Sequence, residues 1–125
     1  MLQNTMSNFS KELSIGNIYV AVVIPCYKVS RHIQTVIAGI GEEVRQIYVI
    51  DDACPEGTGR LVNEIVKDDR VKVIFHTENN GVGGAVLSGY RAAIDDGADV
   101  IVKVDGDGQM DPALIPVLIW PILTG

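Results

Sequence analysis

The sequence predicts an α/β domain with a parallel sheet covered by helices on both faces, a Rossmann-like doubly wound arrangement. Two observations predict it. Short apolar segments rich in β-branched residues alternate four times with segments of helical period, and the connections are short. Polar or glycine-containing clusters follow each apolar segment, as expected at the ends of buried parallel strands.

The first unit begins with a continuously apolar strand over 19–24, which Pro25 closes. Helical spacing starts soon afterwards, and Ser30 is predicted to cap a helix that ends at Gly41. The predicted apolar stripe of this helix consists of Ile33, Val36, Ile37 and Ile40.

The second unit repeats the pattern. An apolar run over 46–50 predicts a strand that stops at Asp51 and Asp52. Thr58 is predicted to cap the following helix. Its apolar stripe consists of Leu61, Val62, Ile65 and Val66.

The third unit consists of a strand over 71–75 and a helix that follows the turn 79–81 and stops near Gly97. The stripe predicted for this helix is Val82, Val86, Gly89 and Ala93. A fourth strand over 100–104 then leads directly to Asp105.

A last helical stretch is predicted after Asp111 and Pro112, a capping residue followed by proline at the first helical position. The segment 114–123 is the most apolar part of the chain, but it is only ten residues long and contains Pro116 and Pro121. It is therefore too short and too interrupted to span a bilayer.

Composition narrows the classes of protein. A chain of 125 residues with 47% hydrophobic content suits one globular domain. The formal charge is -6 and no Lys/Arg cluster occurs, so nucleic acid is not an expected partner, and an anionic ligand would need a metal. Two cysteines, Cys26 and Cys54, are too few for a disulfide framework. Free thiols suit a reducing compartment, which predicts a cytoplasmic setting.

Residues 1–17 are expected to form a flexible leader, followed by a domain over 18–125.

The segment Asp105-Gly106-Asp107-Gly108-Gln109 is the most informative motif. Oxygen-bearing side chains at i, i+2 and i+4 can converge on one hard divalent cation, and the glycines leave room for a phosphate. A solvated Asp/Gly turn is the alternative interpretation. The polar clusters after the other strands favour a ligand site, because parallel strands end at one edge of the sheet.

Other phosphate and metal motifs fit less well. No glycine-rich turn follows the first strand, which argues against a dinucleotide-binding domain. An EF-hand is excluded, because Met110 and Pro116 stand where glycine and glutamate are required. A haloacid-dehalogenase-type phosphatase remains a minor alternative, although its Asp-x-Asp-Gly turn normally opens the domain.

Together these motifs resemble family 2 glycosyltransferases of GT-A fold, particularly dolichyl-phosphate mannosyltransferases and bacterial polyprenyl-phosphate sugar transferases. The matching segments, in the family's order, are 22–27, 50–52 with Gly57-Thr58, 80–83 with Gly89, and 105–109 with Asp111-Pro112.

The resemblance implies inverting transfer of a sugar from a nucleotide-diphosphate donor to an acceptor, expected to be a polyprenyl or dolichyl phosphate. It places Tyr27 beside the donor base and Asp52 on a base nitrogen. The implied nucleotide-sugar contacts are Pro25, Tyr27, Asp51, Asp52, Gly81 and Asp105, and the implied ligands of Mg²⁺ or Mn²⁺ are Asp105, Asp107 and Gln109.

The resemblance assigns no catalytic residue within this sequence. In the family, the acceptor-binding segments and any general base follow the matching region. A general base, if the reaction uses one, is therefore expected beyond Gly125, the last residue.

Several residues depart from the family pattern or lack an expected ligand role. Lys28 stands where the family usually has Asn, and we expect its ammonium group to be solvated. Cys54 replaces a usual Ser and is expected to be a packing residue, because no adjacent base or basic cluster would lower its pKa. His32 and His76 lack metal-ligand spacing, and Lys103 is expected to form a salt bridge.

Two hypotheses follow for the whole chain. It is either the donor-binding half of a longer, peripheral membrane enzyme, inactive alone, or a nucleotide-sugar- or metal-binding module without catalysis. The hypothesis of a donor-binding half predicts self-association. Later strands of the longer enzyme would cover the edge of the fourth strand and a set of apolar residues, and without these strands both are exposed. That set is Leu114, Ile115, Leu118, Ile119 and Trp120.

Overall fold

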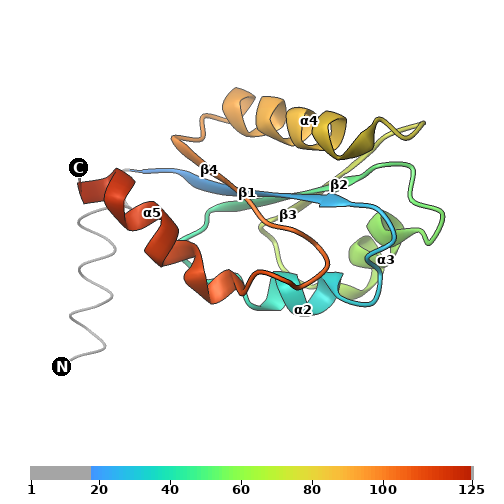
Figure 1. Ribbon diagram of the computed structural model, residues 1–125, viewed down its shortest axis with the longest axis horizontal. Coiled ribbons are helices and arrows are strands. Elements are labelled where there is room, and N and C mark those ends of the chain that lie inside the picture. The colour runs from blue at the N-terminus through green and yellow to red at the C-terminus, as the bar shows by residue number, and fades with distance from the viewer. Residues whose placement is uncertain (1–17, 125) are drawn as a thin grey trace.

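A four-stranded parallel sheet forms the centre of the protein (Figure 1). The structure is a computed structural model that describes residues 18–124, with side chains to Pro121. The expected leader over 1–17 and Gly125, the last residue of the expected domain, lie outside the described residues. The strands are β1 (Val20–Cys26), β2 (Gln46–Asp51), β3 (Val71–Phe75) and β4 (Val100–Lys103), in the order β3-β2-β1-β4. All four predicted strands are confirmed, but Pro25, which was expected to close the first strand, lies within β1 and pairs with Ile50 of β2.

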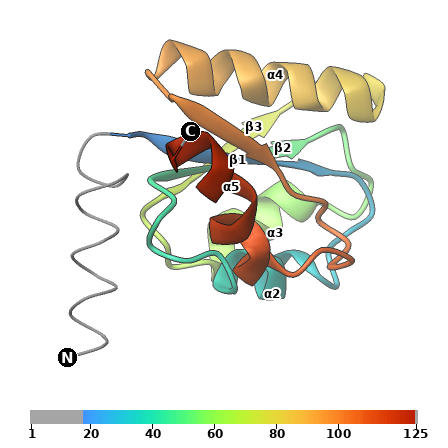
Figure 2. The same ribbon diagram turned by 60° about the vertical axis from the view of Figure 1, so that its left-hand side comes forward.

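Helices cover both faces of the sheet, as predicted. Figure 2 shows α4 alone on one face, with the other helices on the opposite face. The helices are α2 (Ile33–Ala38), α3 (Thr58–Ile65), α4 (Gly81–Asp95) and α5 (Ile115–Thr124), with a 3₁₀ turn over Pro112–Leu114. No helix in the described part of the chain is long and apolar enough to cross a membrane.

The central strand β1 contributes to two hydrophobic cores. Val22 and Ile24 pack with residues of α2 and α5, whereas Ala21 and Val23 pack with residues of α4. Burial on both sides explains why β1 is continuously apolar rather than alternating. Gly89 of α4 is buried against Val23, and a Cβ atom at this glycine would overlap Val23 Cγ1.

The predicted cap of α2 is wrong. The helix begins at Ile33 after His32, which makes no side-chain capping bond, and it ends at Ala38 before Gly41 is reached. The Ser30 hydroxyl instead donates to Glu56 Oε1 at 2.9 Å. This bond joins the loops after β1 and β2, a tertiary contact that helical spacing cannot reveal.

The predicted cap of α3 is also wrong by one residue. Gly57 is the N-cap, with a φ of 67°, and Thr58 is the first helical residue. The Thr58 side chain is buried, and its hydroxyl lies 3.2 Å from Cys54 Sγ. Thr58 therefore closes the loop before the helix rather than capping the helix.

The predicted stripe of α4 is partly wrong. Ala85, Gly89 and Ala93 are the buried residues of this helix, whereas Val82 is 62% exposed. The helix begins at Gly81, so Val82 lies in its first turn, at the carboxyl edge of the sheet.

The start of the last helical stretch is confirmed. The Asp111 carboxylate accepts a hydrogen bond from the Ala113 N–H at 2.9 Å, and Pro112 follows it at the first position. The expected loss of cover is only partly correct, because Ile115 and Ile119 are buried in the core. The exposed apolar residues of this region are Leu114, Val117, Leu118 and Trp120.

Candidate functional site

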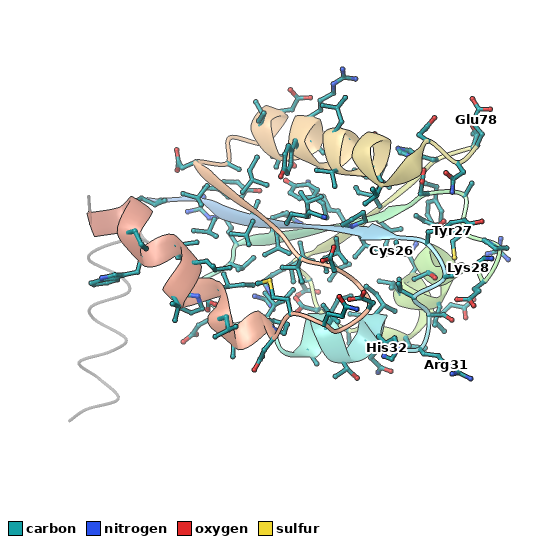
Figure 3. The ribbon with its side chains drawn as sticks, in the orientation of Figure 1. Cys26, Tyr27, Lys28, Arg31, His32 and Glu78 are labelled. Carbon is teal, nitrogen blue, oxygen red and sulfur yellow. The ribbon has the colours of Figure 1, made fainter. Side chains whose placement is uncertain are left out.

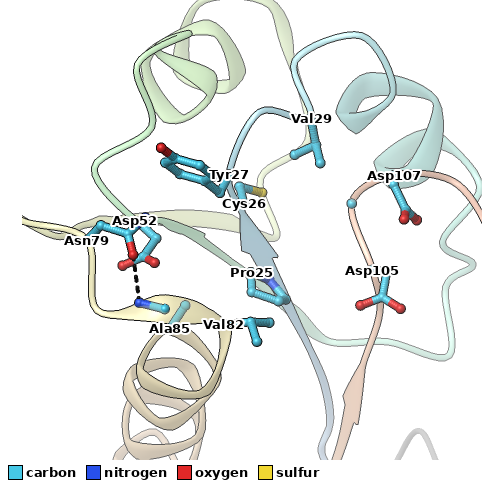
Figure 4. Close-up of a pocket in the computed structure, with 12 residues that line it drawn as sticks. Pro25, Cys26, Tyr27, Val29, Asp52, Asn79, Val82, Ala85, Asp105 and Asp107 are labelled. Carbon is cyan, nitrogen blue, oxygen red and sulfur yellow. Dashed lines mark hydrogen bonds between the residues drawn. The ribbon is translucent and has the colours of Figure 1, made fainter.

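A pocket of about 390 Å³ lies at the carboxyl ends of the strands (Figure 4). The chain adds β2 and β3 on one side of β1 and then places β4 on the other side. Such a switch point is where open α/β sheets bind ligands. The pocket is lined by Pro25, Cys26, Tyr27, Val29, Asp52, Asn79, Gly81, Val82, Ala85 and the segment 105–107.

The structure brings most of the predicted site residues to this pocket. Those that line it are Pro25, Tyr27, Asp52, Gly81, Asp105 and Asp107. Asp51 and Gln109 are not among the lining residues. Figure 4 shows Asp105 and Asp107 on the opposite side of the pocket from Asp52 and Asn79.

Asp51 is the last residue of β2 and holds the loop that follows the strand rather than lining the pocket. It is 4% exposed, and both its oxygens are used within the protein. Oδ1 accepts from the Cys54 N–H and Oδ2 from the Gly59 N–H, each at 2.7 Å. A direct contact of Asp51 with the nucleotide stays a prediction, and of the two neighbouring carboxylates only Asp52 lines the pocket.

Asp52 lies at the pocket with only part of its carboxylate engaged. Oδ1 accepts from the Asn80 N–H at 2.9 Å and lies 2.8 Å from His76 Nδ1. The other ring nitrogen of His76, Nε2, lies 2.8 Å from the Ser88 hydroxyl. The spacing of Asp52, His76 and Ser88 along the chain does not reveal that they lie together, because they come from three separate parts of the fold.

Tyr27 is 45% exposed and presents its ring at the end of β1, where Figure 3 shows it beside Lys28. The Lys28 ammonium lies 5.5 Å from the ring centroid, and the residue is exposed, as expected. The Lys28 backbone has a φ of 59°, a region that lysine rarely adopts, and its N–H donates to Cys54 Sγ at 3.1 Å.

The pKa of Cys54 is lowered, although no base or basic cluster contributes. Burial raises the pKa of this thiol, but hydrogen bonds from Thr58 and from the Lys28 backbone outweigh burial and hold the pKa below its ordinary value. Cys54 is nevertheless buried and does not line the pocket, which agrees with a packing role.

Asp105 and Asp107 are exposed carboxylates that share the pocket. Asp105 Oδ1 lies 3.2 Å from Lys103 Nζ, which confirms the salt bridge expected for that lysine. The Gln109 N–H donates to Asp107 Oδ1 at 3.0 Å, while the glutamine itself is exposed. Within residues 18–124, no group of three or more His, Cys, Asp or Glu residues is placed to hold a metal.

The predicted position of a general base lies outside the described residues. The resemblance places any such base beyond Gly125, and the structure describes the chain from residue 18 to residue 124. A general base beyond Gly125 therefore stays a prediction, and none of the pocket carboxylates is assigned that role.

The family model for glycosyl transferase family 2 matches residues 21–124, nearly the whole described domain. The chain belongs to this family. The resemblance seen in the sequence is thereby confirmed, and the haloacid-dehalogenase alternative is overturned by the match.

Curated relatives of this glycosyl transferase family 2 chain include lipid-phosphate sugar transferases. It is 32% identical over 108 residues to the undecaprenyl-phosphate mannosyltransferase of Micrococcus luteus and 33% identical over 110 residues to the dolichol-phosphate mannosyltransferase of Pyrococcus furiosus. The alignments cover 84% and 85% of this chain, but 44% and 30% of the relatives. The chain thus spans less than half the length of these relatives.

Solved structures confirm the GT-A fold. A mannosyltransferase from Pyrobaculum calidifontis, solved in complex with GDP-Man and Mn²⁺, superposes with a TM-score of 0.62 at 20% identity, covering 85% of this chain and 34% of that one. A mycobacterial protein gives a TM-score of 0.69 at 21% identity, covering 94% and 39%. At these identities the likeness concerns the fold alone.

Proposed function

We propose that this glycosyl transferase family 2 domain binds a nucleotide-diphosphate sugar and serves inverting transfer of the sugar to a polyprenyl or dolichyl phosphate. One observation carries the proposal. An aromatic ring, a buried carboxylate and a pair of exposed carboxylates line the same pocket at the switch point of the sheet. The names of two relatives, an undecaprenyl-phosphate and a dolichol-phosphate mannosyltransferase, support the class of acceptor.

The nucleotide would occupy the side of the pocket formed by the ends of β1 and β2. The Tyr27 ring offers a flat surface for stacking, and the Asp52 carboxylate can accept a hydrogen bond from a base N–H. Pro25 and Gly81 line the same pocket. Gly81 has a φ of 78°, which glycine adopts without strain and which starts α4 close to the ligand volume.

Asp105 and Asp107 fit a divalent cation such as Mg²⁺ or Mn²⁺. Their carboxylate oxygens are the hard ligands that these ions prefer, and both residues are exposed at the pocket. Between them, Gly106 packs tightly, because a Cβ there would lie 3.0 Å from Val29 Cγ2. A bound cation would neutralise charge on the departing diphosphate.

The remaining ligands would come from the donor phosphates and water, as is usual for Mg²⁺. The salt bridge from Lys103 to Asp105 joins exposed groups, so exchanging it for a cation costs little. Gln109 stays a predicted ligand, since its side chain is exposed and only its backbone N–H contacts Asp107.

A lipid-phosphate acceptor suits a site without an assigned general base. Its phosphate oxygen is already an anion and can attack the anomeric carbon without losing a proton, whereas a hydroxyl acceptor needs a carboxylate to remove one. Attack from the side opposite the leaving diphosphate inverts the anomeric centre. Because such an acceptor is anchored in a membrane, the full-length protein would act as a peripheral protein at the cytoplasmic face.

A binding and transfer panel tests this proposal. The protein is titrated with GDP-, UDP- and dTDP-sugars in the presence of Mn²⁺, and its melting temperature is followed, because a ligand that binds only the folded state raises it. The preferred donor, carrying a radiolabelled sugar, is then incubated with a polyprenyl phosphate. A rise in melting temperature supports the proposed donor binding, and the absence of any rise contradicts it. Binding without transfer by residues 1–125 agrees with a donor-binding half that is inactive alone. Binding without transfer by the full-length protein favours a nucleotide-sugar-binding module, and lipid-linked product supports the whole proposal.

A further inference from the structure

His76 connects the pocket carboxylate to helix α4. The residue directly follows β3, with Nδ1 2.8 Å from Asp52 Oδ1 and Nε2 2.8 Å from Ser88 Oγ. The side chains of His76 and Asp52 are 11% and 4% exposed. Hydrogen bonds this well shielded from water restrict rotation of both groups.

The contacts determine which ring nitrogen carries the proton. An ionised carboxylate can only accept, so the short contact with Asp52 requires a hydrogen on Nδ1 of His76. The Asn80 amide nitrogen lies 3.3 Å from the same Nδ1, and the hydrogen goes to the shorter, charge-assisted contact. Nε2 lies against the Ser88 hydroxyl, which can donate or accept, so this contact orients the ring whereas the contact with Asp52 places the proton on Nδ1.

Only one oxygen of the Asp52 carboxylate, Oδ1, accepts hydrogen bonds from the protein residues that the structure describes. Oδ1 receives two hydrogen bonds, one from the Asn80 N–H and one from His76. From residue 18 to residue 124, no hydrogen bond is made to Oδ2, and Asp52 lines the pocket. The second oxygen is therefore available to a ligand as a pure acceptor.

We propose that His76, oriented by Ser88, is a positioning residue that presents Asp52 Oδ2 to the pocket and so selects nucleotide bases with a ring N–H. Guanine, uracil and thymine have such a group. Adenine and cytosine carry an unprotonated ring nitrogen at the corresponding position, whose lone pair faces the carboxylate unfavourably. The inference rests on the proposed nucleotide-sugar function and specifies the class of base.

A hydrolytic role for the same three side chains does not fit their placement. Serine, histidine and aspartate also form this chain of contacts in serine hydrolases. A nucleophile must reach its substrate, however, and Ser88 lies within α4 and is not among the residues that line the pocket. The group is suited to holding Asp52, not to attacking a ligand.

Three variants test the positioning role. His76→Leu removes the donor to Asp52, His76→Asn keeps an amide donor near the position of Nδ1, and Ser88→Ala removes the group that orients the ring. His32→Leu is the matched control, because His32 is exposed and makes no contact with Asp52. Calorimetry with GDP, UDP, ADP and CDP in Mn²⁺ measures affinity, and circular dichroism confirms that each variant is folded.

We expect His76→Leu to weaken binding of GDP or UDP about tenfold, to reduce the preference over ADP and CDP, and to be largely rescued by Asn. We expect Ser88→Ala to have a smaller effect in the same direction and His32→Leu to have none. Equal affinities and base preference in wild type and His76→Leu would overturn the positioning role, whereas a wild-type protein that binds no nucleoside diphosphate would overturn the proposed function itself.

Nitrogen-15 NMR of the unliganded wild-type protein provides a readout that needs no variant. The long-range nitrogen–proton pattern of the His76 ring distinguishes a proton on Nδ1 from one on Nε2 alone. A protonated Nδ1 in wild type supports the inference. A wild-type ring protonated only on Nε2 would overturn it.

Discussion

The backbone N–H of Gly59 donates to Asp51 Oδ2 at 2.7 Å, across the start of α3. A Cβ atom at residue 59 would lie 2.8 Å from the same oxygen, so only glycine allows this approach. The neighbouring Asp52 instead lies at the pocket. Two consecutive carboxylates thus have different roles, one in the fold and one at the candidate site.

This division predicts opposite outcomes for two matched substitutions. Asp51→Asn replaces one of the two buried acceptor oxygens by an NH₂ group, which cannot accept, so we expect the free energy of unfolding to fall by about 2 kcal/mol. Asp52→Asn can keep Oδ1 for its two donors but places an NH₂ group at the pocket, so we expect nucleotide affinity to fall by about 1–3 kcal/mol with a smaller change in stability. Urea unfolding and calorimetry measure the two effects. Equal effects of both variants on stability and on affinity would contradict the division.

The close packing of α4 on β1 predicts a large effect of one methyl group. Gly89→Ala would force Cβ into Val23, and we expect it to lower the free energy of unfolding by about 1–3 kcal/mol through overpacking. Gly83→Ala on the same helix meets no atom within 4 Å and is the matched control. We expect the control to be neutral or stabilising by up to about 1 kcal/mol, because alanine favours helix. A neutral Gly89→Ala in urea denaturation would show that the two elements can separate freely.

The fold was predictable because its strongest signal is local. Burial on both faces makes β1 apolar at every position, and the same periodicity rules locate the other strands. Helix starts were less predictable, because Ser30 and Thr58 form tertiary hydrogen bonds that replace the expected caps. Local sequence does not specify which distant partner a hydroxyl group meets.

The candidate site was predictable to the extent that it follows from strand ends. Tyr27, Asp52 and Asp105 follow different strands and meet because parallel strands end together. The role of Asp51 in its loop and the contact between His76 and Asp52 depend on side-chain orientation. Neither can be inferred from spacing along the chain.

The left-handed backbone of Lys28 predicts a stabilising substitution. Left-handed conformation costs a lysine about 1–2 kcal/mol, and asparagine tolerates it better. The exposed contact of the ammonium with Tyr27 is worth about 0.5 kcal/mol, which offsets part of the gain. We expect Lys28→Asn to raise the free energy of unfolding by about 0.5 kcal/mol. Lys67→Asn, at an exposed position with ordinary φ, is the control, and a fall in stability specific to Lys28→Asn would argue against backbone strain.

Self-association stays a prediction, and the surface expected to mediate it is smaller than the sequence suggested, because Ile115 and Ile119 are buried. Val117 and Leu118 of α5 are 66% and 51% exposed, and β4 is an edge strand. Neighbouring exposed apolar residues promote association. We expect sedimentation velocity to detect oligomers that Leu118→Glu disperses, whereas Ile94→Glu, on α4 over the opposite face, leaves them unchanged. A monomer at high concentration in the wild type would refute this prediction.

The central claim is that the carboxylates after β4 and the residues after β1 and β2 form one metal-dependent nucleotide site. Titration calorimetry of a nucleoside diphosphate with and without Mn²⁺ tests it most directly, in wild type, in Asp107→Ala and in Asp95→Ala. Asp95 is exposed at the other end of α4 and controls for loss of charge. We predict Mn²⁺-dependent binding in wild type and Asp95→Ala and its loss in Asp107→Ala, which should remain folded because the residue is exposed. Unchanged Mn²⁺-dependent affinity in Asp107→Ala would contradict the account.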